Sequence, residues 1–507
     1  MTDVPVAQQR EWLTAWVVRH TGTTPILRET HVSILAFAGD QVWKCKKAVR
    51  FPFIDLSTAA RRLENGEREV LLNRRLAPDV YLGVVALDDA QGAVLDHLVE
   101  MRRLPESRRL SAVVAHDAND AQACIDALAD LLVQFHARAG TGGDIDRAAS
   151  PAALTELWTG SFEELRPFAG AVLDAGVYQQ VTRDALAYLR GRTVLFEQRI
   201  AAGRIRDGHG DLLADDVFCL PEGPRVLDCL EFDERLRFGD VLADVAFLAM
   251  DLERLDHHHL ARRFLDRYRA GTGDDWPASL ADFYIAYRAL VRTKVACLRV
   301  ADDPDAAATA EHLLGLAADH LARARVRLVL VGGPPATGKT TVARALARVT
   351  GWPVLRSDEV RKELAGVAPT TDAAAPVDRG LYTGAWSDRT YATLLARARV
   401  LLEGGHSVIL DASWSTDERR AQADALASET AGESTSFVCD VPAATADERA
   451  RDRALAGDDA SDATPAVAAA LRARFAPWPG AEVLDTTDPA DAVASRMHAR
   501  LGPTSRP

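Results

Sequence analysis

The segment Arg327–Ala343, with the sequence RLVLVGGPPATGKTTVA, constrains the fold of this chain more than any other. Its apolar run Leu328–Val331 predicts a buried strand, and the alanine-rich, amphipathic run Thr341–Val349 predicts a helix. The loop between them fits G-x-x-x-x-G-K-[ST] at each fixed position. Those positions hold Gly333, Gly338, Lys339 and Thr340. A strand, a glycine-rich loop and a helix in this order predict a P-loop in an α/β domain.

This loop is predicted to bind the phosphates of ATP. Its two glycines let backbone N–H groups turn towards phosphate oxygens, and the helix N-terminus adds partial positive charge. Lys339 is expected to neutralise the β- and γ-phosphates, and the Thr340 hydroxyl to bind Mg²⁺. The alternative is a Gly/Pro turn before a helix, with no ligand. The predicted nucleotide-binding residues are Gly333, Pro334, Pro335, Ala336, Thr337, Gly338, Lys339, Thr340 and Thr341.

Length and composition set broad limits. A chain of 507 residues with 48% hydrophobic residues is expected to form two or three globular domains. The net charge of −13 argues against broad, sequence-independent nucleic-acid binding, although local basic patches stay possible. The six scattered cysteines suggest neither a disulfide framework nor a zinc site, and so favour a reducing compartment. Without an apolar signal core or a run of membrane-spanning length, we expect a cytoplasmic protein that does not enter a membrane.

Lysines inside a predicted strand mark the N-terminal half. The strand Gln41–Val49 carries Lys44 and Lys46 on one face, because strand side chains alternate. The helix predicted from Ser57 to Leu76 follows and carries Glu69. A strand lysine paired with a helix glutamate is how kinase-like folds hold a phosphate-binding lysine. The alternative is a solvated strand face.

A polar loop rich in acids follows a helical middle region. The loop contains His209-Gly210-Asp211-Leu212 and Asp216. A strand predicted at Arg225–Phe232 carries Asp228 and Glu231, and an apolar helix that follows begins with Asp240 and Asp244. The pattern H-G-D-L-x-x-x-[N/D], then a hydrophobic residue and Asp, then G-D-x-x-x-D, resembles the aminoglycoside phosphotransferase and choline kinase family. The resemblance implies a protein-kinase-like fold of two lobes.

The same resemblance implies roles for these acids. Asp211 is expected to accept the proton of a substrate hydroxyl. Asp216 takes the position of a metal-binding Asn, and Asp228 is the best match to the second Mg²⁺ ligand, with Glu231 as its competitor. Leu213 and the Asp at 216 depart from the family pattern, so a lobe without catalysis is an alternative.

The remaining matches concern the lysines and the loop. Lys44 matches the phosphate-binding lysine best, with Lys46 as the fallback, and Glu69 is its expected partner. Asp240 and Asp244 are expected to fix the loop and to cap the helix that follows.

The region after the P-loop predicts an acceptor site. A short strand delivers Asp358 at its end, with Arg361 one helical turn later, and a core strand ends in Asp411. Ligands of open α/β sheets bind at such strand ends. The arrangement resembles gluconate, shikimate and polynucleotide kinases, which implies that Asp358 faces the acceptor hydroxyl, Arg361 binds the acceptor and Asp411 supports Mg²⁺. The alternative for the first two is an N-cap aspartate and a surface arginine.

Four further residues complete this predicted site. Ser413 and Trp414 continue from the strand end and are expected to bind the acceptor. Arg449 and Arg453 share a helix face, and the resemblance implies a mobile lid whose arginines stabilise the transferring phosphoryl group. A solvated charged helix face is the alternative.

Together these patterns predict an α+β protein-kinase-like domain over residues 1–325, followed by an α/β P-loop domain with a parallel sheet over residues 326–507. The order resembles bacterial proteins that fuse the two domain types. The expected function is ATP- and Mg²⁺-dependent phosphoryl transfer to a hydroxyl of a small molecule such as a sugar, polyol, nucleoside or aminoglycoside. In the alternative, the N-terminal domain is the only transferase or lacks catalysis, and the P-loop domain is a regulator or acts on polynucleotide 5′-hydroxyls. The sequence leaves the oligomeric state open.

Overall fold

The computed structural model describes residues 4–51, 54–368, 379–456 and 465–505, without the side chains of residues 453–456 and 465. Close contacts divide the chain into two units. Unit 1 comprises Met1–Ala153 and Arg199–Asp275, and unit 2 comprises Leu154–Gln198 and Trp276–Pro507. Unit 2 contains the P-loop, and this division also assigns to it the helical residues 154–198 and those that follow Trp276. A domain boundary between residues 325 and 326 stays a prediction.

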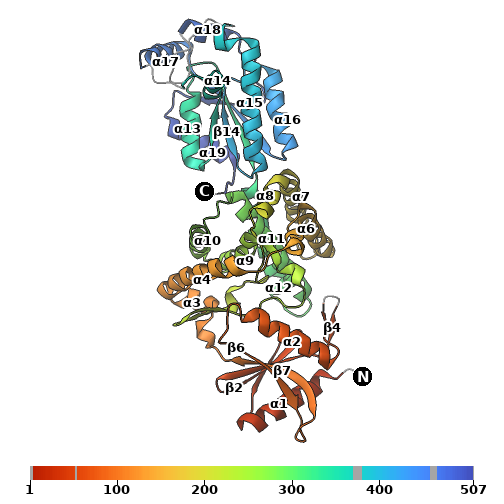
Figure 1. Ribbon diagram of the computed structural model, residues 1–507. Coiled ribbons are helices and arrows are strands. Elements are labelled where there is room, and N and C mark those ends of the chain that lie inside the picture. Colours follow the sequence, from red (N-terminus) through yellow and green to blue (C-terminus); the bar gives the residue numbers. More distant parts are fainter. Residues whose placement is uncertain (1–3, 52–53, 369–378, 457–464, 506–507) are drawn as a thin grey trace. The chain divides into compact units, whose positions relative to one another are not determined.

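Unit 1 contains a five-stranded antiparallel sheet in the order β1-β2-β3-β7-β6. Its strands are β1 (Ile26–Glu29), β2 (Ser33–Ala38), β3 (Gln41–Lys46), β6 (Tyr81–Asp88) and β7 (Val94–Arg102). Strand β3 alternates, as the sequence predicts: Trp43 and Cys45 are buried with residues of helix α1 (Val6–Thr21), while Val42 faces the other side. Helix α2 (Ala59–Asn73) packs on that second side, against β6 and β7 (Figure 1).

The rest of unit 1 consists of helices and short hairpins. The helices are α3 (Leu110–His116), α4 (Ala118–Arg138), α5 (Gly143–Ala148), α9 (Val241–Arg254) and α10 (His258–Thr272). The short strands are β4 (Arg50–Phe51), β5 (Ile54–Asp55), β8 (Ile205–Asp207), β9 (Val217–Leu220), β10 (Gly223–Val226) and β11 (Phe238–Asp240). Strand β9 pairs with β10, and β8 pairs with β11, both antiparallel. The strand predicted at Arg225–Phe232 therefore ends at Val226, and the acids beyond it lie in a loop.

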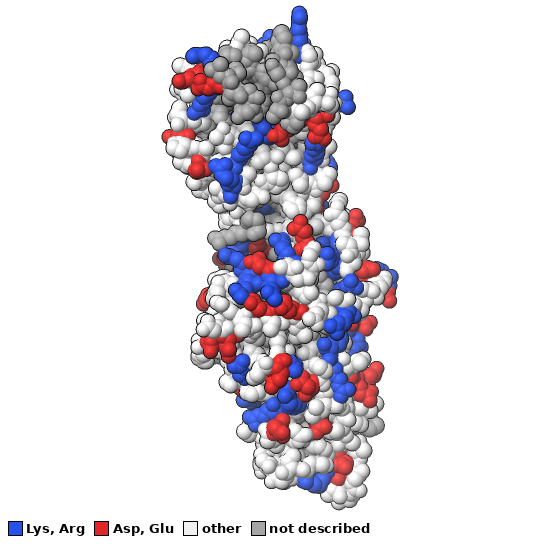
Figure 2. All heavy atoms as spheres, turned by 60° about the vertical axis from the view of Figure 1, so that its left-hand side comes forward, with Lys and Arg blue, Asp and Glu red and all other residues white. Residues whose placement is uncertain are grey.

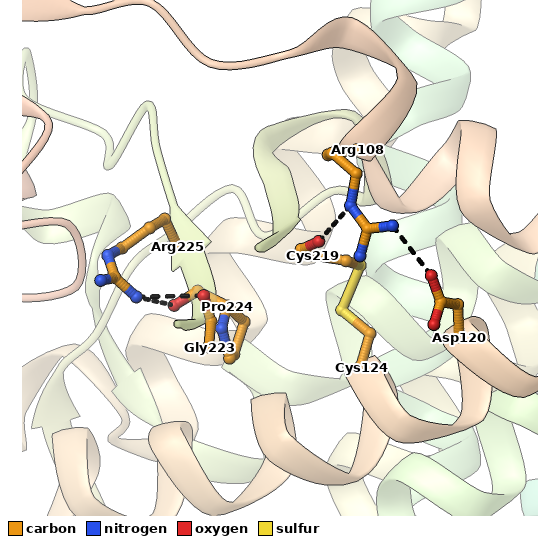
Figure 3. The surroundings of a disulfide bond; sticks show 7 residues. All are labelled: Arg108, Asp120, Cys124, Cys219, Gly223, Pro224 and Arg225. Carbon is orange, nitrogen blue, oxygen red and sulfur yellow. Dashed lines mark hydrogen bonds and ion pairs between the residues drawn. A yellow bond between two sulfur atoms is a disulfide. The ribbon is translucent and has the colours of Figure 1, made fainter. Parts of the chain in front are cut away.

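A disulfide joins two of these elements and corrects the expectation of none. Cys124 of α4 is bonded to Cys219 of β9, with their Cα atoms 5.6 Å apart (Figure 3). Arg108 lies beside the bond, donating to the Cys219 carbonyl oxygen and pairing with Asp120 at 2.8 Å. Cysteine spacing does not reveal this pair because 95 residues separate the two sulfurs along the chain and only the fold brings them together.

Unit 2 is built around a parallel five-stranded sheet in the order β13-β14-β12-β15-β16. The strands are β12 (Arg327–Gly332), β13 (Val354–Arg356), β14 (Val408–Asp411), β15 (Glu433–Asp440) and β16 (Glu482–Asp485). All six residues of β12 are buried, as expected for the central strand of a sheet covered on both faces. Figure 1 shows α13 and α19 on one side of this sheet and α15 and α16 on the other.

Helices complete unit 2. Those of the P-loop region are α13 (Lys339–Thr350), α14 (Ser357–Leu364), α15 (Gly384–Glu403), α16 (Asp417–Glu429), α17 (Ala443–Ala456), α18 (Pro465–Ala473) and α19 (Ala490–Leu501). The others are α6 (Pro151–Leu165), α7 (Ala175–Gly191), α8 (Thr193–Ala201), α11 (Ala278–Arg299) and α12 (Ala306–Ala324). Helices α6 and α8 cross the division between the units by a few residues.

Figure 2 shows basic and acidic side chains interspersed over the visible face. Within the described ranges, no helix combines the length and the apolar character needed to span a bilayer.

Candidate active sites

The loop between β12 and α13 has the backbone that the P-loop motif requires. Gly333 and Gly338 have φ values of 132° and 89°, a region that L-residues rarely adopt. A Cβ on Gly333 would lie 2.6 Å from the carbonyl oxygen of Cys439. Gly338 is also the N-cap of α13, so the loop presents free N–H groups at a helix N-terminus. The sequence prediction of these two glycines' role agrees with this geometry.

Lys339 and Thr340 already have hydrogen-bond partners within the protein. Lys339 Nζ donates to the Pro334 carbonyl oxygen at 2.8 Å, and Thr340 Oγ1 donates to Asp411 Oδ2 at 2.6 Å. Arg356 adds a contact that the sequence analysis missed: its Nε lies 3.3 Å from Asp411 Oδ2. No pattern along the sequence shows this contact, because it arises from the parallel register, in which Arg356 at the end of β13 is the partner of Asp411 at the end of β14.

Asp411 is a buried carboxyl in a mixed electrostatic environment. Burial raises the pKa of Asp411 above its usual value, while Lys339, Thr340 and Arg356 act in the opposite direction. A hydroxyl and a carboxylate at hydrogen-bond distance are the oxygen ligands that Mg²⁺ prefers, so these residues fit the ion. The described residues contain no group of three or more His, Cys, Asp or Glu side chains that could hold a metal. A Mg²⁺ site that uses one or two protein oxygens together with substrate phosphates does not need such a group of side chains.

A cavity of about 570 Å³ opens from this loop. Asp358, Arg361, Ser413 and Arg449 all line it, so the structure brings these predicted site residues together. Helix α14 begins at Ser357, which places Asp358 in its first turn and not at the end of a strand as the sequence analysis expects. The P-loop residues on the cavity wall are Pro334, Pro335, Ala336, Gly338, Lys339, Thr340 and Thr341, whereas Thr337 is buried behind them.

The two predicted lid arginines differ. Arg449 of α17 lines the cavity and donates through Nη2 to the Thr486 carbonyl oxygen at 2.8 Å. Thr486 in turn donates to the Thr337 carbonyl oxygen at 2.5 Å, so Arg449 is tied to the P-loop. The side chain of Arg453 lies outside the described residues.

Trp414 is not where the sequence analysis placed it. Its side chain is fully buried and is not part of the cavity wall. The indole Nε1 donates to the Leu410 carbonyl oxygen at 3.4 Å, and the ring packs edge-on against Tyr391. Trp414 has a positive φ of 52°, which turns its side chain away from the direction that the strand would give it. The neighbouring Ser413 lines the cavity and lies 3.0 Å from the Tyr391 hydroxyl.

In unit 1 the predicted lysine and glutamate form an ion pair. Lys44 Nζ lies 2.7 Å from Glu69 Oε1 and 2.9 Å from Asp228 Oδ1. Lys46 Nζ contacts the other Glu69 oxygen at 2.6 Å and Glu231 at 2.7 Å. Lys44 and Asp228 line the nearby cavity, whereas Lys46 and Glu231 do not. The geometry therefore favours Lys44 over Lys46, and Asp228 over Glu231, for the predicted roles.

The His209–Asp211 loop is held by Asp244, as expected. The two Asp244 oxygens accept from the backbone N–H groups of His209 and Gly210, at 2.8 and 2.9 Å. His136 supports the same carboxylate at 3.0 Å. Asp240 caps α9 by accepting from the Leu242 N–H at 2.9 Å. Both expectations for these aspartates are confirmed.

A second cavity, of about 110 Å³, lies in unit 1, and the residues that line it do not include His209, Gly210 or Asp211. Its walls combine apolar side chains, among them Phe37 and Phe218, with charged ones, among them Lys44, Asp216 and Asp228. Lys44 lowers the pKa of Asp228. Burial, with Asp228 and Asp211 nearby, raises the pKa of Asp216 well above its usual value. The carboxyl at position 216 is thus a poorly solvated acid close to others.

One family model and several proteins are similar to this chain. The AAA_33 family, described as "AAA domain", matches residues 328–478. "Uncharacterized protein Rv2004c" of Mycobacterium tuberculosis is 43% identical over 473 residues, which cover 93% of this chain and 94% of that protein. "Uncharacterized protein Mb2027c" of Mycobacterium bovis matches with the same identity and coverage.

Solved structures similar to this chain include two kinases. One is a putative kinase from Chloroflexus aurantiacus, with a TM-score of 0.29, 21% identity and coverage of 34% of this chain and 98% of that one. The other is a choline/ethanolamine kinase family protein from Mesorhizobium loti, with a TM-score of 0.39, 17% identity and coverage of 62% and 94%. The lysine-bearing antiparallel sheet of unit 1 and the parallel P-loop sheet of unit 2 confirm the predicted fold class.

Proposed function

The chain belongs to the same family as the mycobacterial protein Rv2004c. We propose that it is a kinase that transfers the γ-phosphoryl group of ATP to a hydroxyl group. The active site is the cavity of unit 2. The observation that carries the proposal is that the P-loop Lys339, the Thr340–Asp411 pair and Asp358 in the first turn of α14 all line one cavity. Phosphoryl transfer needs these groups around one space: cations for the phosphates and a carboxylate for the acceptor hydroxyl.

Each residue has a task in this proposal. The N–H groups of the P-loop and the ammonium of Lys339 hold the β- and γ-phosphates, which requires Lys339 to exchange the Pro334 carbonyl oxygen for phosphate. Thr340 and Asp411 would hold Mg²⁺, which supplies charge neutralisation on the phosphates when bound. Asp358 orients the acceptor hydroxyl and accepts its proton. Arg449 approaches the phosphates from α17 and stabilises charge on the transferring group.

A second candidate function places the chemistry in unit 1. The ion pair between Lys44 and Glu69, beside Asp216 and Asp228 at a separate cavity, supports a second nucleotide site there. In this version Asp211 is the base that receives the acceptor proton, and the P-loop domain binds ATP as a regulator. The larger cavity and the complete P-loop favour unit 2 as the site of transfer.

The test is phosphoryl transfer by the full chain, measured with radiolabelled ATP and a panel of hydroxyl compounds. We expect Lys339→Ala to lower turnover by about 10²-fold, the usual effect of removing one group that stabilises transition-state charge. Arg344→Ala is the matched control, because Arg344 is an exposed cation on the same helix. Full activity in the Lys339→Ala variant would contradict the proposal.

Two further variants separate the candidate sites. Asp358→Asn and Asp211→Asn each replace a carboxylate by an amide of the same shape. We expect Asp358→Asn to abolish transfer and Asp211→Asn to leave it unchanged. The reverse result would assign transfer to unit 1, and loss in both variants would show that the two sites depend on each other.

A further inference from the structure

Among the described residues, the cavity of unit 2 has more cationic than anionic side chains on its wall. Of the residues that the structure describes, two carboxylates line it, Asp358 and Asp411, against five cationic side chains. These are Lys339, Arg361, Arg419, Arg449 and Arg474. Lys339 belongs to the P-loop, and Arg449 is tied to it through Thr486. Arg361 and Arg419 come from other elements, the helices α14 and α16.

Arg361 is a buried cation for which the described part of the chain supplies no counter-ion. It is only 6% exposed, and no ion pair joins it to a carboxylate of a described residue. One nitrogen donates to the Leu381 carbonyl oxygen at 3.1 Å, and Nε is buried without any acceptor. A buried guanidinium with an unsatisfied N–H is costly unless a ligand completes it. Its position on the cavity wall shows where such a ligand would lie.

Arg419 repeats this arrangement on the same cavity. Its guanidinium lies 4.5 Å from the centre of the Tyr391 ring, as that of Arg361 lies 4.8 Å from the Tyr382 ring. Both tyrosines also line the cavity, so each guanidinium is held against an aromatic wall of the same space. Its partner Asp388 is 3.4 Å away and 78% exposed, which makes a weak ion pair.

We propose that the acceptor is an anion: besides the hydroxyl that receives the phosphoryl group, it carries a carboxylate or phosphate group that binds between Arg361 and Arg419. Guanidinium groups match the geometry of such oxyanions and bind them with paired hydrogen bonds. The inference rests on the proposed function and narrows its acceptor class. It excludes aminoglycosides from this cavity, because their ammonium groups would face two cations.

Direct binding of inorganic sulfate tests the anion site without turnover. The full chain is first saturated with a non-hydrolysable ATP analogue and Mg²⁺, which fills the P-loop, and sulfate is then titrated by calorimetry. We expect saturable binding that Arg361→Gln and Arg419→Gln each weaken at least tenfold. Arg389→Gln is the matched control, because Arg389 also stacks on an aromatic ring, that of Trp386, but is exposed and outside the cavity.

If Arg361→Gln does not fold, Arg419→Gln decides the result, because Arg419 is not part of the buried core. Absence of saturable sulfate binding, or equal binding in wild type and Arg419→Gln, would overturn the proposal.

A matched acceptor set then identifies the anion. Glucose, glucuronate and glucose 6-phosphate share one ring and differ at carbon 6, which is neutral, a carboxylate or a phosphate. We expect one of the charged compounds to bind at least tenfold more tightly than glucose, and the one that does names the group. Transfer to glucose as efficient as to both charged compounds would contradict the anion site and leave the kinase proposal intact. Sulfate binding without transfer to any compound would contradict the kinase proposal alone.

Discussion

At the scale of single residues, two carboxyls of the unit 1 cavity differ in how they are neutralised. Asp228 faces Lys44 at 2.9 Å and has a lowered pKa because of it. Asp216 has no such partner at this distance among the described residues, and burial raises its pKa. The sequence analysis noted the aspartate at this position as a departure from the family pattern, and the structure shows its electrostatic consequence.

We predict that Asp216→Asn stabilises the chain at pH 7, by about 1 kcal/mol, because this half-buried carboxyl near Asp228 and Asp211 no longer has to ionise. The pKa of Asp216 is higher in the folded state than in the unfolded state. Wild type therefore loses stability as the pH rises from the pKa of the unfolded state to that of the folded state. The advantage of the variant should therefore be present at pH 7 and vanish below about pH 4. Urea unfolding at both pH values measures it. An equal difference at both would contradict the raised pKa.

At the scale of elements, the turn between β12 and α13 depends on glycine for its shape. Gly338→Ala is expected to destabilise the chain by about 1–2 kcal/mol and to weaken ATP binding, because φ is 89° there. Gly315→Ala, in the interior of α12 with no atom within 4 Å of its added Cβ, should instead stabilise by about 0.5–1 kcal/mol. Thermal unfolding with and without an ATP analogue measures both. Equal effects of the two variants would show that the loop is not constrained.

The disulfide between α4 and β9 is a second constraint at this scale. Strand β9 also carries Phe218, which lines the cavity of unit 1. Because the bond closes a loop of 95 residues, we expect the Cys124→Ser, Cys219→Ser double variant to lose about 2–4 kcal/mol of unfolding free energy. Dithiothreitol should destabilise wild type by a similar amount and have no effect on the double variant. A double variant as stable as wild type would show that the bond contributes little.

At the scale of the whole molecule, the division by contacts joins helices that precede residue 326 to the P-loop domain. Ser279 Oγ donates to the Gly405 carbonyl oxygen at 2.6 Å, Arg192 donates to that of Leu402, and Arg325 pairs with Asp184 at 2.9 Å. The sequence analysis placed the boundary just after these helices, because periodicity describes each helix but not its packing partner.

We predict that a fragment of residues 326–507 is less stable than the same region in the full chain, by at least about 2 kcal/mol. It loses the partners of Leu402 and Gly405. A fragment of residues 276–507 retains Ser279, and its stability should lie between that of the 326–507 fragment and that of the full chain. Hydrogen exchange of the β12 and β14 amides measures this stability in all three. Equal protection in the 326–507 fragment and the full chain would support the boundary predicted from sequence.

The features that the sequence determined by itself are those whose physics is local. The P-loop geometry follows from the spacing of Gly333 and Gly338, and the shared face of Lys44 and Lys46 follows from strand alternation. The tertiary structure alone decided which of the two lysines lines a cavity, that Trp414 lies in the core, and that Arg356 reaches Asp411. It also joined Cys124 to Cys219 and placed Arg361 and Arg419 on one cavity. Such contacts link residues distant in the chain, and a pattern along the sequence records periodicity and spacing but not which distant elements pack together.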